Sequence, residues 1–86
     1  MKKIVLAPNP YRDRGLALTM EAKSLLERDG FEVVISPTFV DVPSDSRMQP
    51  LLQAAEGAEL IITLGGDGTM LHVARRVLTL GVPMMG

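Results

Sequence analysis

The chain has 86 residues, 47% of them hydrophobic, and it contains no cysteine. A domain of this size buries only about 60–65% of its unfolded surface, and without cysteine neither disulfides nor thiolate metal sites can stabilise it. Nine basic and ten acidic residues give a formal net charge of −1, and only three residues are Phe or Tyr. These features exclude the basic surface of a DNA- or membrane-binding protein and the aromatic platform of a single-strand binder, so we expect a small-molecule partner.

The first apolar run, residues 4–7, follows two lysines and ends at the proline-containing segment 8–10. This run is too short for the hydrophobic region of a signal peptide, and no later run approaches the roughly 20 residues of a membrane span. Its continuous apolar pattern is typical of a strand buried on both faces. We therefore predict a first β-strand and a cytoplasmic location.

The next part of the chain has a helical pattern followed by a strand pattern. Residues 13–29 predict a helix, with Asp13 as its N-cap and Gly30 as the residue after its C-terminus. Residues 31–35 are rich in β-branched side chains and predict a second strand. The positions that we expect to bury this helix are Leu18, Ala22, Leu25 and Leu26.

The second half of the chain continues the alternation. Residues 38–46 predict a loop, residues 48–56 a short helix, and residues 58–64 a third strand. Residues 69–80 predict an amphipathic helix, and residues 82–86 begin a fourth strand. The expected apolar stripe of the last helix is Met70, Val73, Ala74, Val77 and Leu78, its polar stripe is His72, Arg75, Arg76 and Thr79, and Met70, Met84 and Met85 are expected to fill the core.

Alternating strands and helices predict an α/β fold, in which a parallel sheet has right-handed crossovers and helices on both faces. Ligands of such sheets bind beyond the carboxyl ends of the strands. The loops expected there are residues 8–13 and residues 65–69. Because the sequence stops within or just after the fourth strand, we expect a piece of a larger protein.

The segment between the third strand and the last helix, residues 64–69, has the sequence LGGDGT. A tight turn into a helix N-terminus exposes backbone N–H groups at the positive end of the helix dipole, which is a natural phosphate site. Neither the P-loop pattern GxxxxGK[ST] nor the dinucleotide fingerprint GxGxxG is present. The sequence therefore predicts a phosphate-binding turn of another kind.

Asp67, the carboxylate inside this turn, has two interpretations. It can cap the last helix by accepting N–H bonds of the first turn, a role that Thr69 can share. Alternatively, it is a general base that takes a proton from an attacking hydroxyl, or a second-shell ligand of Mg²⁺. The residues by themselves leave these alternatives open.

His72 follows Gly68 by one helical turn, so its side chain can point back toward the glycines. A lone histidine on the polar face of a helix can also be simply solvated. The other polar candidates are interpreted as structural: Arg75 and Arg76 as surface charges, and Asn9, Tyr11 and Arg12 as turn and helix-start residues.

Three stretches resemble the N-terminal lobe of NAD kinases: residues 64–71 (LGGDGTML), the pair Ala74-Arg75, and residues 81–86 (GVPMMG). The Asn9-Pro10 pair after the first strand also resembles that family. The glycine motif is shared with diacylglycerol and sphingosine kinases and, less closely, with phosphofructokinases, whereas the VPxxG ending favours NAD kinase. The resemblance implies a Rossmann-like or phosphofructokinase-like N-terminal α/β nucleotide-binding lobe over residues 1–86. The family's Asn-Asn-Glu motif and β-rich C-terminal lobe are absent from this chain.

The resemblance implies transfer of the γ-phosphoryl group of ATP, or of polyphosphate in some members, to the adenosine 2′-hydroxyl of NAD, which gives NADP. It also implies Mg²⁺ or another divalent metal, a homo-oligomeric complete enzyme, and no activity of the 86-residue piece alone. Asp67 matches the proton acceptor of the family, Asp67 and Gly68 match NAD-contacting positions, and His72 lies where a basic residue is often near the dinucleotide. The rest of the matched nucleotide-binding loop is Gly65, Gly66 and Thr69.

Two other functions remain open at this point. One is a lipid kinase lobe of the diacylglycerol or sphingosine type. The other is a non-catalytic α/β module that holds a nucleotide or phosphate, in which Asp67 is only a helix cap.

Overall fold

The structure is a computed structural model that describes residues 2–42, 44–45 and 48–86. Its strands form a single parallel sheet in the order β2-β1-β3-β4. The strands are β1 (Lys3–Pro8), β2 (Glu32–Ile35), β3 (Leu60–Leu64) and β4 (Met84–Met85). The helices are α1 (Ala17–Arg28), α2 (Leu51–Ala55) and α3 (Asp67–Val77), with short 3₁₀ helices η1 (Arg14–Leu16) and η2 (Leu78–Leu80).

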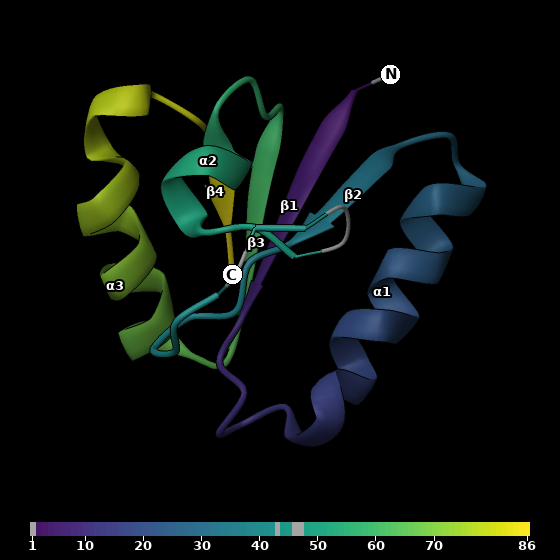
Figure 1. Cartoon of the computed structure of the whole chain (residues 1–86), viewed down its shortest axis with the longest axis horizontal. Coiled ribbons are helices and arrows are strands. Elements are labelled where there is room, and N and C mark those ends of the chain that lie inside the picture. Colours follow the sequence, from purple (N-terminus) through teal and green to yellow (C-terminus); the bar gives the residue numbers. More distant parts are fainter. Residues whose placement is uncertain (1, 43, 46–47) are drawn as a thin grey trace.

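Helices cover both faces of this sheet (Figure 1). Successive side chains of β1 point to opposite faces, so Ile4 and Leu6 pack with α1 while Val5 and Ala7 pack with α2 and α3. Because both faces are covered, β1 is buried along its length, which explains its continuous apolar run. The predicted parallel α/β fold is confirmed.

The predicted start of the first helix is wrong. Gly15 and Leu16 have φ angles of +65° and +57°, so a continuous helix cannot begin at Asp13. The chain makes the short η1 turn, and α1 begins afterwards. Its predicted end is confirmed: the N–H groups of Gly30 and Phe31 donate to the carbonyls of Glu27 and Leu26, the bonding pattern of a Schellman motif.

Two of the leucines predicted to bury α1 are exposed instead. Leu18 and Leu25 have exposed fractions of 62% and 55%, whereas Ala22 and Leu26 pack against the sheet. Thr19 is fully buried on the same helix. Leu18 precedes the buried Thr19 and Leu25 precedes the sheet-packed Leu26, so each leucine is rotated by about 100° around the helix from a buried position.

The predicted helix over residues 48–56 is reduced to α2. Met48 instead forms a parallel bridge with Ile35 of β2, and Pro50 has an extended backbone at the N-cap position. Pairing with β2 therefore keeps the chain extended up to Pro50. Of the predicted loop over residues 38–46, residues 43 and 46 lie outside the described residues.

The last helix differs from the predicted 69–80 at both ends. α3 begins at Asp67, and after Val77 the chain tightens into η2. A 3₁₀ turn has about three residues per turn, so later side chains leave the α-helical phase, and Leu78 is 79% exposed rather than buried. Met85 is also half exposed and does not fill the core. Within the described residues, no helix has the length and apolar content that crossing a bilayer requires.

Candidate functional site

The glycine turn lies at the point where the chain's connections diverge. β1 and β3 are neighbours in the sheet, but β1 leads to α1 on one face and β3 leads to α3 on the other. Ligands of open α/β sheets bind at such a switch point. The N–H of Asn9 donates to the carbonyl of Leu64 at 2.8 Å, so the loops after β1 and β3 meet there (Figure 1). The predicted juxtaposition of these two loops is confirmed.

Gly65 is the contact between the two loops. Its φ is +147°, and a Cβ at this position would lie 2.6 Å from the Cβ of Asn9 and 2.8 Å from the Oγ1 of Thr69. Gly66, with φ +100°, has open space around it and is the N-cap residue of α3. Residue 65 must therefore be glycine, because the turn packs closely against it. At Gly66 the backbone is exposed and no side chain covers it.

Asp67 is the first residue of α3 and is exposed. The N-cap of the helix is Gly66, and no side-chain cap hydrogen bond is made, so the capping interpretation of Asp67 is wrong. Thr69 does not cap either: it is 2% exposed, and its Oγ1 has no hydrogen-bond partner among the described residues. The carboxylate of Asp67 is thus at the positive end of the helix dipole with its oxygens available for other partners.

His72 is half buried on α3 and is not simply solvated. Its ring centroid lies 4.3 Å from that of Phe39, with an angle of 35° between the planes. Phe39 reaches it from the loop after β2 with a left-handed φ of +63°. Both rings line a cavity of about 780 Å³, together with Asp41 and Arg76.

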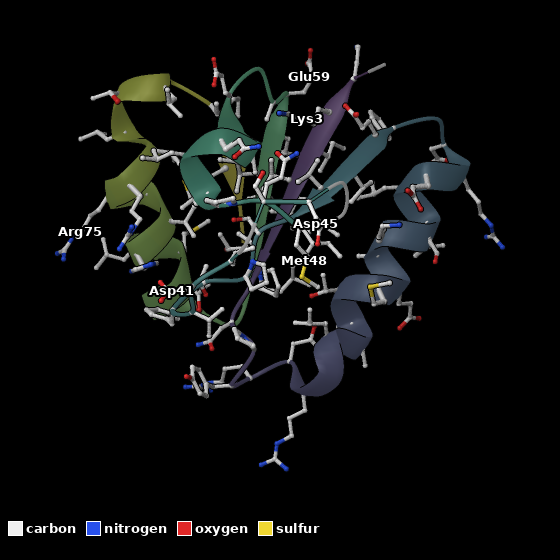
Figure 2. All side chains as sticks on the ribbon, in the orientation of Figure 1. Lys3, Asp41, Asp45, Met48, Glu59 and Arg75 are labelled. Atoms are coloured by element: carbon white, nitrogen blue, oxygen red, sulfur yellow. The ribbon has the colours of Figure 1, made fainter. Side chains whose placement is uncertain are left out.

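The two arginines of α3 differ in their surroundings. Arg75 points away from the body of the molecule, as its label in Figure 2 shows, in keeping with its interpretation as a surface charge. Arg76 is also exposed, but it follows His72 by one helical turn and lines the same cavity. Asp41 lies over the N-terminal end of α3 in the same view (Figure 2).

Asp13 organises the loop after β1. It is 6% exposed, its Oδ1 accepts from the N–H of Leu18 at 3.0 Å, and its Oδ2 accepts from the N–H and hydroxyl of Thr19 at 2.9 and 2.6 Å. The hydroxyl bond from Thr19 lowers the pKa of Asp13, burial opposes this, and the two N–H bonds lower the pKa further. Asp13 therefore does cap the first turn of α1, but from outside the helix, because the N-cap residue itself is Leu16.

The described residues contain no group of three or more histidine, cysteine, aspartate or glutamate side chains that could hold a metal ion. Mg²⁺ is commonly bound by one or two carboxylates together with substrate phosphates.

A family comparison decides between the kinases that share the glycine motif. The family model described as the ATP-NAD kinase N-terminal domain matches residues 4–86. The chain belongs to the NAD kinase family.

Its curated relatives agree with this family. The chain is 36% identical over 86 residues to the NAD kinase of Agathobacter rectalis, and the match covers the whole chain and 30% of that protein. The match to the NAD kinase of Acidithiobacillus ferrooxidans is 45% identical over 92 residues and covers 95% of this chain and 29% of the relative. This NAD kinase family chain thus spans about 30% of the length of the relatives that it matches. No solved structure matches it.

In this NAD kinase domain, the residues predicted for the site fall into two neighbouring groups. Gly65, Gly66, Gly68 and Asp67 form the turn and first residues of α3, with Thr69 buried beneath them. His72 is one turn further along, facing the loop after β2 rather than the glycines.

Two residues that line cavities were not among the predicted site residues. Phe39 lines a cavity with His72, and Arg12 lines a smaller cavity together with Gly65 and Gly66. The sequence feature that could have identified them is their position, since each lies in a loop that follows the carboxyl end of a predicted strand.

Proposed function

We propose that this chain is the N-terminal nucleotide-binding lobe of an NAD kinase that phosphorylates the adenosine 2′-hydroxyl of NAD with ATP to give NADP. The observation that carries the proposal is the family match over residues 4–86. The carboxylate of Asp67 at the start of α3 supports it, because this carboxylate makes no helix-capping bond that would weaken it as a proton acceptor.

In the proposed reaction Asp67 is the proton acceptor. The 2′-oxygen forms a bond to the γ-phosphorus, the bond from that phosphorus to the bridging oxygen of ADP breaks, and the hydroxyl proton passes to the carboxylate. Phosphoryl transfer depends mainly on positioning and on stabilising the charge of the phosphoryl oxygens. Asp67 at the edge of the turn is assigned only the proton transfer.

The glycine turn supplies the positioning. Gly65 and Gly66 present backbone without side chains, and the first N–H groups of α3 favour negative charge. We assign Gly68 with Asp67 to NAD contacts and His72 to the neighbourhood of the dinucleotide, and Thr69 to the support of the turn. The cavity that His72 and Phe39 line has about 780 Å³, within the range typical of small-molecule sites.

We propose this function for the complete protein. We propose that residues 1–86 act with a β-rich C-terminal lobe outside this chain, in a cytoplasmic homo-oligomer. Because the chain spans about 30% of its relatives, we expect no turnover from the 86 residues alone. Mg²⁺ is expected to arrive on the ATP phosphates.

The test is the variant Asp67→Asn in the complete protein. We expect kcat for NADP formation to fall by about 10²–10⁴-fold, the contribution of a positioned base. The melting temperature should stay unchanged, because the carboxylate makes no capping bond. The matched control is Asp29→Asn, an exposed carboxylate at the end of α1, which should retain full activity. Near-normal turnover by Asp67→Asn would refute the role of the base.

The same protein separates the alternatives. Phosphorylation of diacylglycerol or sphingosine in place of NAD would indicate a lipid kinase, which the family comparison disfavours. Tight binding of NAD and ATP by the complete protein, with no turnover of NAD or lipid, would indicate a binding module.

A further inference from the structure

The loop after β2 crosses to α3 and contacts it through a pair of aromatic rings (Figure 1). The base of this loop is fixed at Thr38, whose N–H and hydroxyl donate to the carbonyl of Pro8 at 2.8 and 2.9 Å. The next residue is Phe39, whose ring centroid lies 4.3 Å from that of His72. Among the described residues, this ring contact is what ties residues 39–42 to α3. We call the loop closed when the contact is made.

Phe39 makes the contact in an unfavourable conformation. Its φ of +63° is left-handed, which a bulky L-residue rarely adopts. Its side chain is 47% exposed, so burial of the ring compensates for the backbone only in part. Strain of this kind persists only where surrounding contacts hold it, and it is common at ligand clamps and switch regions. The closed loop is therefore held by a small margin, which a change at His72 can alter.

His72 is the partner in this contact that can change its charge near neutral pH. Histidine side chains ordinarily titrate at about pH 6.5. A cation within about 6 Å of the centroid of an aromatic ring is attracted to the face of that ring. The observed separation of 4.3 Å, with 35° between the ring planes, lies within that distance. Protonation of His72 therefore strengthens its attraction to Phe39.

The charged groups around His72 fall into those on the loop and those on its own helix. Asp41 lines the same cavity from the loop, so its attraction to a protonated His72 also favours the closed loop. Arg76, which lines the cavity too, and Asp67 belong to α3 with His72 and act on it whether the loop is closed or open. They affect the pH at which His72 becomes charged, but not the direction in which that charge moves the loop.

Desolvation of the imidazole is the effect that opposes the closed loop, because covering a charged ring removes water from it. This cost is limited here. His72 is only half buried, and it lines a cavity of about 780 Å³. The rest of the described cavity wall, from the loop after β2 and the start of α2, is uncharged. The attraction of Phe39 and Asp41 therefore decides the direction of the effect.

From these contacts we infer that Phe39 and His72 form a pH-sensitive latch, in which protonation of His72 shifts the loop after β2 toward its closed position. The closed loop supplies one wall of the cavity, including Thr38, Phe39 and Val40. A preformed cavity binds its ligand more tightly, because less order has to be gained on binding. The latch itself does not depend on the proposed function, whereas its effect on NAD binding rests on that function.

The latch is tested by limited digestion of the complete protein with chymotrypsin, without ligand. Cleavage after Phe39 requires the loop to open, whereas Tyr11 is exposed, does not line the cavity and reports the pH dependence of the protease itself. We expect the ratio of cleavage after Phe39 to cleavage after Tyr11 to be about threefold lower at pH 6 than at pH 8. In His72→Gln this ratio should be the same at both pH values.

A ratio that is equal or higher at pH 6 in the wild type, or that falls equally in His72→Gln, would overturn the inference. So would protection of Phe39 at both pH values, because a loop that does not open is not a latch. Circular dichroism checks that His72→Gln folds. If it does not fold, Asp41→Asn replaces it: the pH dependence of the ratio should then become smaller, and an unchanged dependence would contradict the role of the loop carboxylate.

Kinetics of the complete protein test the consequence for the proposed function. We expect KM for NAD to be about threefold lower at pH 6 than at pH 8, and this pH dependence should disappear in Phe39→Leu. Val40→Ala, at an exposed residue of the same loop, is the control and should keep it. If the cleavage ratio changes as expected but KM does not, the latch stands and its role in NAD binding is refuted. A protein that does not phosphorylate NAD would refute the proposed function and leave the digestion result unaffected.

Discussion

The loop after β1 and the loop after β2 reach the same end of the sheet, but they are held there very differently. The first is fixed by the Asn9–Leu64 bond, by close packing on Gly65 and by the three bonds to Asp13. The second is anchored at Thr38, whose N–H and hydroxyl both donate to the carbonyl of Pro8. Beyond Thr38, within the described residues, this loop is held by the ring contact of Phe39 with His72.

This difference suggests that the loop after β1 and the loop after β2 have different roles. A rigid, hydrogen-bonded loop suits the phosphate chain, whose geometry must be exact for transfer. The loop after β2, which is held at one end, can adjust to a larger ligand. Ligand-binding loops commonly belong to the less stable parts of a fold. Three substitutions test the comparison, from the largest expected effect to the smallest.

Gly65→Ala should have the largest effect, because it breaks the contact between the first loop and the turn. The new methyl group would lie 2.6 Å from the Cβ of Asn9, at a φ of +147° that L-residues rarely adopt. We expect a loss of about 3 kcal/mol in the free energy of unfolding, measured by urea denaturation. Gly68→Ala is the control: this glycine is helical with open space around it, so alanine should stabilise by about 0.5–1 kcal/mol. Equal effects would refute the close packing at Gly65.

Asp13→Asn should come next, because it replaces a carboxylate oxygen that accepts two donors. We expect a loss of roughly 2–3 kcal/mol at pH 7, whereas Asp29→Asn, at an exposed carboxylate, should change little. The pKa of Asp13 is lowered in the fold, so its stabilisation is complete above the usual value of 3.8 and is lost as the pH falls through the lower folded value. The difference between wild type and Asp13→Asn should therefore shrink in acid below that value. A pH-independent difference would contradict a charged role.

Thr38→Val should have the smallest effect, about 1 kcal/mol, because the carbonyl of Pro8 keeps its bond from the N–H at residue 38. Thr79→Val, at an exposed threonine of η2, is the control and should be neutral. His72 is the only histidine, so its ring protons report the Phe39 contact without ambiguity in NMR spectra. We expect these signals to shift in Thr38→Val and to stay in Thr79→Val. If Thr38→Val lowered the free energy of unfolding as much as Asp13→Asn does, the loop after β2 would be held as firmly as the loop after β1.

Some features of the fold could be predicted from the pattern of single segments. The continuous run of β1, the β-branched β2 and the alternation of helices and strands each reflect local burial, and they were enough to predict a parallel α/β sheet. The features that were wrong depend on long-range pairing. Met48 bridges to β2 instead of entering a helix, and Leu18 and Leu25 are exposed because α1 turns Ala22 and Leu26 toward the sheet.

The sequence alone determined that a glycine turn with one carboxylate follows a buried strand, because glycine spacing and apolar periodicity are local properties of the chain. It could not determine whether Asp67 caps the helix, since that depends on the backbone of Gly66. Nor could it place Arg12 and Gly65 around one cavity or Phe39 against His72, because these residues are separated by 53 and 33 positions in the chain and come together only when the strand order brings their loops together. The residue types of the turn can be read from neighbouring positions in the chain, whereas the shape of the site depends on which strands become neighbours in the sheet.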